Sequence, residues 1–283
     1  MDGLLASLPD GASVAVVTML GSLCPVTLAH VQCFVEARRI LLSQAPQKVA
    51  RPARLPYFDE CVGLVWLNSD VVVISKVKEK GQKPLSYAER ARLVSLATAE
   101  LPWLSFDEGQ GLRELRRRFP SLRLTEFDMN GADDVVKYQK WQFTGPNQPM
   151  IVIGRPGVTR QVIEGMRDGK IDPDDGFCIL GPELSDISST AVRDASSQGD
   201  RKALLSMLHP AVADAMLRRD GHGGLDSLDM AVLSSPGERT ASSSGVLTRQ
   251  KPGSRVAPGE ARAKAGRALP AAAAKAKALG RRR

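Results

Sequence analysis

Residues 14–30 read VAVVTMLGSLCPVTLAH, and they combine the two patterns from which an α/β fold is built. The first seven are apolar or small apart from Thr18, which predicts a strand buried on both faces. Gly21 and Ser22 then end that strand. From residue 28 to residue 42 apolar side chains recur at close to helical spacing, so a helix is expected there.

The same alternation continues along the body of the chain. Further strands are expected at residues 62–67, 122–129, 149–154 and 177–180, with residues 71–74 extending the first of them or following a bulge. Helices are expected at residues 86–100, where Ser86 and Glu89 form a capping box, and at 111–119, 133–140, 158–167, 190–196, 201–207 and 211–218. Alternation of this kind predicts an α/β, Rossmann-like open sheet over residues 12–220, mainly parallel, with helices on both faces.

The positive charge of the chain is concentrated at one end. The chain has 39 Lys and Arg residues against 31 Asp and Glu residues, a net charge of +8. Residues 221–283 hold 12 basic and 4 acidic side chains, so the body is neutral. This segment is rich in Ala, Gly, Pro, Lys and Arg and has no aromatic residue, which predicts a disordered basic tail. Contact with nucleic acid is therefore open only to the tail.

Cysteine usage and hydropathy indicate a compartment. The four cysteines are scattered without a CxxC pair, which argues against a disulfide scaffold and favours a reducing environment. The apolar run near the start is interrupted too often for a membrane span, and Asp2 and Asp10 replace the basic start of a secretory signal. We expect an intracellular protein without membrane contact, in the cytoplasm or, given the three terminal arginines, in the nucleus.

The loop after the first strand is the first place to look for ligand-binding residues, because open parallel sheets bind ligands beyond the carboxyl ends of their strands. Gly21 lets a ligand approach the backbone closely. Thr27 and His30 lie three residues apart at the start of a helix, where free N–H groups and the helix dipole favour phosphate. In that setting His30 donates to a phosphoryl oxygen; the alternative is a histidine satisfied within its own helix.

A second cluster of polar residues lies near the end of the body, where residues 187–193 read ISSTAVR. Helix capping accounts for the hydroxyl groups. It does not account for Arg193, which lies one turn into the expected helix and, with Ser189 and Thr190, forms a phosphate-sized set of donors.

Together these residues resemble the nicotinamide/nicotinate mononucleotide adenylyltransferases, a family of the HxGH-type nucleotidyltransferase superfamily. Residues 21–30 are similar to the family signature GxFxPxTxxH, and residues 187–193 are similar to ISSTxxR. Further landmarks stand between them in the family's order: Ser75-Lys76-Val77 with a Lys-rich stretch, the helix start at residues 86–90, Gly131-Ala132-Asp133, Trp141, and Arg155-Pro156-Gly157.

The resemblance implies a reaction and a role for each matching residue. AMP would pass from ATP to a pyridine mononucleotide, giving NAD or its deamido form and pyrophosphate, as a step of NAD biosynthesis. Mg²⁺ would arrive with ATP and need no metal site made by the protein. His30 and Arg193 would be the catalytic pair. The ATP phosphates would contact Gly21, Ser22, Thr27, His30, Lys78 or Lys80 or Lys83, Ser189, Thr190 and Arg193. The mononucleotide or NAD would contact Ser22, Leu23, Trp103, Gly131, Asp133, Trp141 and Arg155.

Some positions depart from the family pattern. Leu23 stands where Phe is usual, and the stretch after Trp103 lacks a second Trp, which leaves the choice between amide and acid substrates open. Two other interpretations remain. One is another transferase of the superfamily, such as a phosphopantetheine adenylyltransferase. The second is a degenerate nucleotide-binding body with a nucleic-acid-binding tail. The sequence also leaves open whether the chain forms a homo-oligomer.

Overall fold

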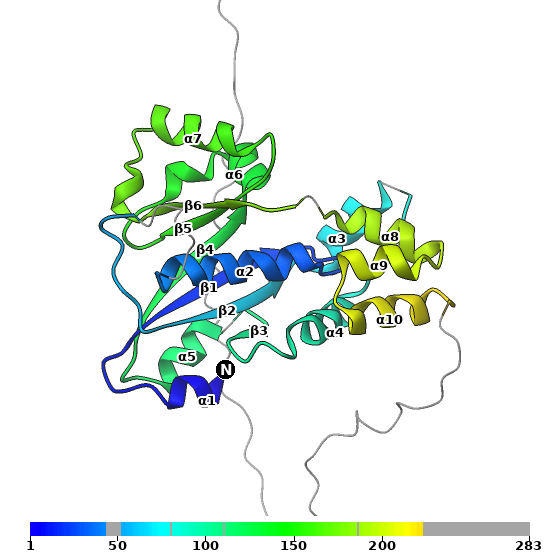
Figure 1. The fold of residues 1–283 in the computed structure, drawn as a ribbon, viewed down its shortest axis with the longest axis horizontal. Coiled ribbons are helices and arrows are strands. Elements are labelled where there is room, and N and C mark those ends of the chain that lie inside the picture. The colour runs from blue at the N-terminus through cyan, green and yellow to red at the C-terminus, as the bar shows by residue number, and fades with distance from the viewer. Residues whose placement is uncertain (44–51, 80, 110, 186, 223–283) are drawn as a thin grey trace, which may run out of the picture. The chain divides into compact units, whose positions relative to one another are not determined.

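The computed structural model describes residues 1–43, 52–79, 81–109, 111–185 and 187–222. Within them, six strands form one sheet in the order β3-β2-β1-β4-β5-β6, and neighbouring strands are parallel throughout. The strands are β1 (Ser13–Gly21), β2 (Glu60–Leu67), β3 (Leu104–Phe106), β4 (Arg123–Gly131), β5 (Met150–Gly154) and β6 (Cys178–Glu183). The direction in which successive strands are added reverses between β1 and β4, which lie side by side at the centre (Figure 1).

Helices precede, join and follow these strands. They are α1 (Asp2–Ala6), α2 (Leu28–Leu41), α3 (Asp70–Lys78), α4 (Tyr87–Thr98), α5 (Gly111–Arg118), α6 (Ala132–Tyr138), α7 (Thr159–Asp168), α8 (Ser189–Ser197), α9 (Arg201–Met207) and α10 (Pro210–Arg219), with short 3₁₀ helices η1 (Lys140–Phe143) and η2 (Pro173–Asp175). None of these described helices combines the length and the apolar character that crossing a membrane requires.

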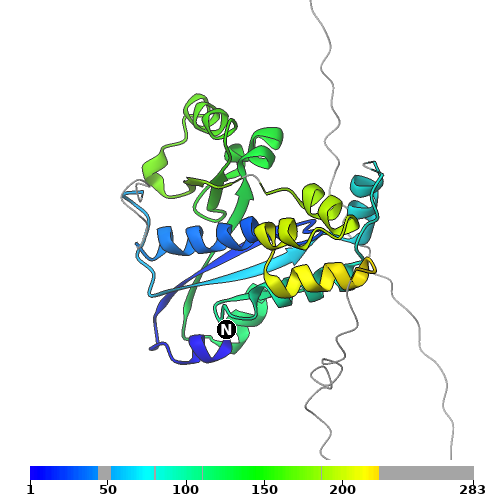
Figure 2. The ribbon, with the colours of Figure 1, turned by 45° about the vertical axis from the view of Figure 1, so that its right-hand side comes forward.

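The two faces of the sheet are covered by different helices, because successive strand residues point to opposite faces. In β1, Ala15 and Val17 join the core formed with α2, α4 and α8 to α10, while Val14 and Val16 pack toward α1 and α5. In β5, Val152 packs toward α6 and α7 on the same face as α1 and α5. The predicted α/β, Rossmann-like sheet with helices on both faces is therefore confirmed (Figures 1 and 2).

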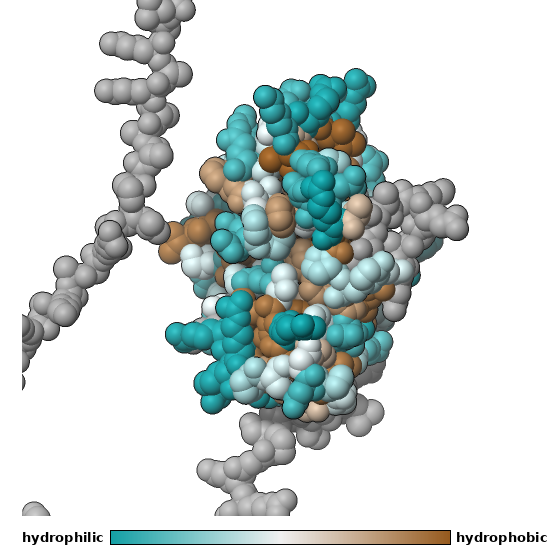
Figure 3. Space-filling model, turned by 90° about the vertical axis from the view of Figure 1, so that its left-hand side faces the viewer, coloured by the Kyte–Doolittle hydropathy of each residue, from teal (hydrophilic) through white to brown (hydrophobic). Residues whose placement is uncertain are grey.

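The second face is covered in two separate parts, and the interval between them positions the site. Helices α1 and α5 pack over one part of the sheet, and α6 and α7 pack over β5 and β6. Between them, β1 and β4 present the polar side chains of Thr18, Glu126, Asp128 and Asn130 to a cleft. On the side where the strands begin, Figure 3 shows a largely hydrophilic surface with separate hydrophobic patches.

Most predicted elements agree with the structure within a few residues, and one prediction is wrong. The prediction of a strand at residues 71–74 is wrong, because these residues lie in α3. Asp70 in the first turn stabilises this helix, since a negative charge there interacts favourably with the helix dipole. Strand β3 has only three residues, too few to show a pattern. Helix α1 was not expected, and its Leu5 packs under the sheet. The predicted disordered tail lies outside the described residues from residue 223 onward.

Candidate functional site

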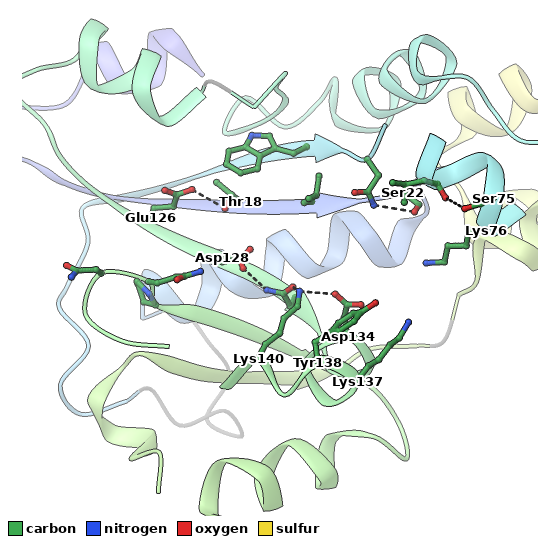
Figure 4. Close-up of a pocket in the computed structure, with 18 of the residues that line it drawn as sticks. Thr18, Ser22, Ser75, Lys76, Glu126, Asp128, Asp134, Lys137, Tyr138 and Lys140 are labelled. Carbon is green, nitrogen blue, oxygen red and sulfur yellow. Dashed lines mark hydrogen bonds and ion pairs between the residues drawn. The ribbon is translucent and has the colours of Figure 1, made fainter. Parts of the chain in front are cut away.

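A cleft of about 930 Å³ opens on the second face of the sheet at the carboxyl ends of β1, β2 and β4. Its floor is formed by strand side chains, and its walls by α3, α6 and η1 (Figure 4). The cleft lies where the strand order reverses, which is where open parallel sheets bind ligands. Its volume is in the range of pockets that hold nucleotide-sized ligands.

The loop after β1 connects this cleft with the opposite face of the sheet. Ser22 lines the cleft, and its hydroxyl accepts a hydrogen bond from the Asn68 amide at 3.4 Å. The next residue, Leu23, adopts a φ of 39°, in the left-handed region, and its side chain is buried in the core on the α2 face. A role for Leu23 in binding a mononucleotide could therefore involve only its backbone.

His30 is held at the start of α2 by a reciprocal cap with Thr27. The Thr27 backbone N–H donates to His30 Nδ1 at 3.0 Å, and the Thr27 hydroxyl lies 2.7 Å from the same nitrogen. Burial, followed by the positive charge of Arg155, lowers the pKa of the imidazole from 6.5 to about 4. The ring is therefore neutral at pH 7. Because Nδ1 accepts, the proton is assigned to Nε2, which has no hydrogen-bond partner within the described residues.

An ion pair lies at the ends of the two neighbouring strands. Arg155 follows β5, and its guanidinium binds the Asp133 carboxylate at 2.7 Å. Asp133 is in the first turn of α6, directly after Gly131 ends β4. Asp133 and Arg155, both selected from the sequence, are thus joined where β4 and β5 end.

Arg193 is bound to the loop between β1 and α2, directly before the helix that carries His30. Its guanidinium donates to the Cys24 carbonyl, to Gln82 Oε1 at 2.7 Å and to Thr190 Oγ1 at 3.2 Å, which uses three of its five N–H donors. The Ser189 hydroxyl donates to the Pro25 carbonyl at 2.9 Å, so the start of α8 is fixed on the loop between β1 and α2. Partial burial lowers the pKa of the guanidinium, which remains charged at neutral pH.

Arg90 fixes the ends of β1 and β2 from within the protein. This side chain is fully buried, and it donates to the Ser22 carbonyl at 3.0 Å, the Asn68 carbonyl at 2.8 Å and the Asp70 carboxylate at 2.9 Å. Its Nε is a buried donor without a partner among the described residues. Arg90 was not singled out from the sequence, since an arginine inside a helix gives no sign of burial.

The lysines nearest the cleft are not those that the sequence indicated. Lys76, Lys137 and Lys140 line it, and Lys140 forms an ion pair with Asp134 at 2.8 Å. Lys78 is exposed in the last turn of α3 and is not among the lining residues. Lys80 lies outside the described residues, and Lys83 is exposed in the loop before α4. Ser75-Lys76-Val77 lies within α3.

The two tryptophans chosen from the sequence lie away from the cleft. Trp103 precedes β3, so it is at the edge where the parallel strands begin, and the Arg38 guanidinium lies 5.0 Å from its ring centroid. Trp141 is buried against α7, where Gly165 leaves the space that its ring fills. The structure therefore gives no support for stacking of a ligand on either ring.

A third tryptophan, Trp66, lies at the carboxyl end of β2 and lines the cleft. Sequence reasoning did not select it, because it falls inside an apolar strand and reads as core. Its position two residues before Asn68, at the end of a predicted strand, was the signal that could have found it.

Protein ligands for a metal are few at this site. Within the described residues no group of three or more His, Cys, Asp or Glu side chains is arranged to hold an ion. The Asp133 carboxylate is already bound to Arg155. Binding of Mg²⁺ together with ATP stays a prediction from the sequence.

Comparisons with known proteins give a distant likeness of structure and none of sequence. No protein-family model matches the chain, and no curated protein matches it. Among solved structures, it is similar to the Plasmodium falciparum nicotinic acid mononucleotide adenylyltransferase complexed with NaAD, at a TM-score of 0.47 and 12% identity over 74% of this chain and 97% of that one. The same enzyme complexed with APC gives a TM-score of 0.46 and 12% identity over 75% and 97%. At this level a likeness does not bear on activity.

Proposed function

We propose that the protein is a nucleotidyltransferase that moves AMP from ATP to nicotinamide or nicotinate mononucleotide, giving NAD or its deamido form and pyrophosphate. The observation that carries the proposal is the convergence of residues far apart in the sequence. His30 lies at the start of α2, directly after the loop that follows β1, and Arg193 donates to the Cys24 carbonyl in that loop. Arg155 is paired with Asp133 where β4 and β5 end. This grouping of signature-like residues beyond the carboxyl ends of the strands supports the proposal.

This arrangement suits a reaction between two anions. Transfer of a nucleotidyl group needs the attacking phosphate and the α-phosphorus of ATP held in line, with their repulsion screened, and little covalent assistance. Two groups would serve as donors: the Nε2–H of the neutral His30 and further N–H groups of Arg193. The start of α2 adds backbone N–H groups and positive potential.

The two substrates would lie on opposite sides of the loop after β1. The ATP phosphates would contact His30, Ser189 and Arg193 on the α2 face, and Asp133 and Arg155 would contact a ribose or base at the edge. The mononucleotide would occupy the cleft, so the attacking phosphate would approach near Ser22, which borders it. Mg²⁺ bound to the ATP phosphates would supply charge neutralisation of the departing pyrophosphate.

Pyrophosphate release measured with ATP, Mg²⁺ and a panel of second substrates tests the proposal. We expect turnover with nicotinamide or nicotinate mononucleotide and none with phosphopantetheine. Turnover with phosphopantetheine alone would assign the chain to the other branch of the superfamily. His30→Ala should lower turnover by at least about 100-fold, with an unchanged circular dichroism spectrum. Near-normal turnover in that variant would remove His30 from the mechanism.

The proposed reaction does not depend on the basic tail, on Lys80 or on the cellular compartment. The basic segment after residue 222 offers phosphate backbones a set of dispersed cations, and the proposed place of action is the cytoplasm or nucleus.

A further inference from the structure

Gln82 is held in place by the way in which α3 ends. The Gly81 N–H donates to the Lys78 carbonyl at 2.9 Å. The Gln82 N–H donates to the Val77 carbonyl at 3.4 Å. These two bonds form a Schellman motif, which favours a left-handed backbone at Gly81, where φ is 67°. The backbone of Gln82 is therefore fixed at the end of a helix that walls the cleft.

The half-buried side chain of Gln82 reaches α8, which lies beside α3 in both ribbon views (Figures 1 and 2). Its amide oxygen accepts the Nε–H of Arg193 at 2.7 Å, and its amide nitrogen donates to Asp194 Oδ1. The orientation of the amide follows from its neighbours, because a guanidinium has no acceptor and a carboxylate has no donor. One neutral side chain thus lies between a cation and an anion that are adjacent in the sequence.

The hydrogen bond from Gln82 completes the support of the Arg193 guanidinium. The Cys24 carbonyl and the Thr190 hydroxyl accept from its two terminal nitrogens, and Gln82 accepts from Nε. All three nitrogens therefore have a protein partner, which sets the plane of the group. A fixed plane matters because a guanidinium recognises phosphate through parallel N–H···O bonds, and their geometry is lost when the group rotates.

Asp194 would compete with a phosphate for the charge of Arg193. Its exposed carboxylate belongs to the residue that directly follows Arg193 in α8. Within the part of the chain that the structure describes, this carboxylate accepts the Gln82 amide and forms no ion pair. Without that amide, the carboxylate would be able to turn toward the guanidinium. The resulting ion pair would reduce the charge that Arg193 offers to a bound phosphate.

We propose that Gln82 is a positioning residue, whose amide fixes the guanidinium of Arg193 and keeps the Asp194 carboxylate from pairing with it, so that Arg193 stays available to an oligophosphate. The inference rests on the proposed function, in which this oligophosphate is the triphosphate of ATP. Gln82 acts through Arg193 and needs no contact with the substrate. Loss of the amide weakens oligophosphate binding, and removal of the competing carboxylate restores it.

Calorimetric titration of the whole chain with inorganic tripolyphosphate tests this without turnover. Gln82→Met keeps the length of the side chain but loses both hydrogen bonds, so it should weaken binding by at least about fivefold. The double variant Gln82→Met/Asp194→Asn should bind within about twofold of the natural chain, because no charge at position 194 is left to pair with Arg193. Asp194→Asn alone should not weaken binding. Gln161→Ala, which removes an exposed glutamine on α7, is the matched control and should change nothing.

Steady-state kinetics separate positioning from a general loss of structure. Gln82→Met should raise the KM for ATP by at least about fivefold and leave the KM for the mononucleotide unchanged. Gln82→Ala should give the same pattern, with an unchanged circular dichroism spectrum.

The outcomes for the inference and for the proposed function can be told apart. Unchanged tripolyphosphate binding in both Gln82 variants, no recovery in the double variant, or no binding by the natural chain would overturn the inference. Pyrophosphate release by the natural chain would then leave the proposed reaction standing. Loss and recovery of tripolyphosphate binding in a chain that releases no pyrophosphate would instead overturn the reaction and leave the inference standing.

Discussion

Replacement of His30 by glutamine tests the electrostatics of the site through the stability of the fold. The folded-state pKa of His30 is about 4, against 6.5 for the ordinary side chain, so between these values the unfolded chain binds a proton that the folded chain does not. The free energy of unfolding therefore rises with pH across this window. The contribution of His30 to it is lost as the pH falls from 6.5 toward 4. From the two pKa values, His30 alone lowers the free energy of unfolding by about 2 kcal/mol between pH 7 and pH 5.

Urea unfolding of the natural chain and of His30→Gln at several pH values from 4.5 to 7.5 measures this contribution. Glutamine at the third helical position can still accept the Thr27 N–H, so the variant retains the cap and loses only the titrating ring. We expect the difference in unfolding free energy between the two proteins to change by about 2 kcal/mol from pH 7 to pH 5. Parallel pH profiles would refute the assignment of a neutral His30 with a lowered pKa.

Three further outcomes follow from packing and from the position of the tail. Arg90→Met should lower the free energy of unfolding by about 3 kcal/mol in urea titrations, because two backbone carbonyls and Asp70 lose a buried donor. Gly165→Ala should destabilise by about 1–3 kcal/mol in the same assay, because its Cβ would lie 2.4 Å from a ring carbon of Trp141, whereas Gly3→Ala, with nothing within 4 Å, should not destabilise the chain. Ending the chain at residue 222 should leave pyrophosphate release unchanged and remove any steeply salt-dependent binding to nucleic acid in gel-shift titrations.

The fold was accessible from sequence wherever local patterns were strong. The apolar run of β1, the capping box before α4 and the alternating run of β4 are patterns of residues close together in the sequence. Each can therefore be recognised without knowing which segments it packs against. The loop with His30 and the helix with Arg193 were found because residue type, spacing and position at a strand or helix boundary coincided.

The remainder depended on contacts between distant segments. The end of the sheet at which a tryptophan lies depends on whether it stands at the start or at the end of its strand. Trp103 comes directly before β3, whereas Trp66 lies at the end of β2. A three-residue strand hides that distinction. Likewise, Lys76 reaches the cleft because residues after β2 form a helix, and the burial of Arg90 depends on carbonyls supplied by two strand ends.

The cleft and the groups around His30 lie on opposite faces of one sheet and meet only at the loop after β1. In the proposed reaction each substrate therefore contacts a single face of the sheet. The dinucleotide formed from them extends across the loop after β1 and is bound on both faces. Such a product dissociates only after the contacts on both faces have broken. We therefore expect its dissociation to be slower than that of the mononucleotide or of ATP.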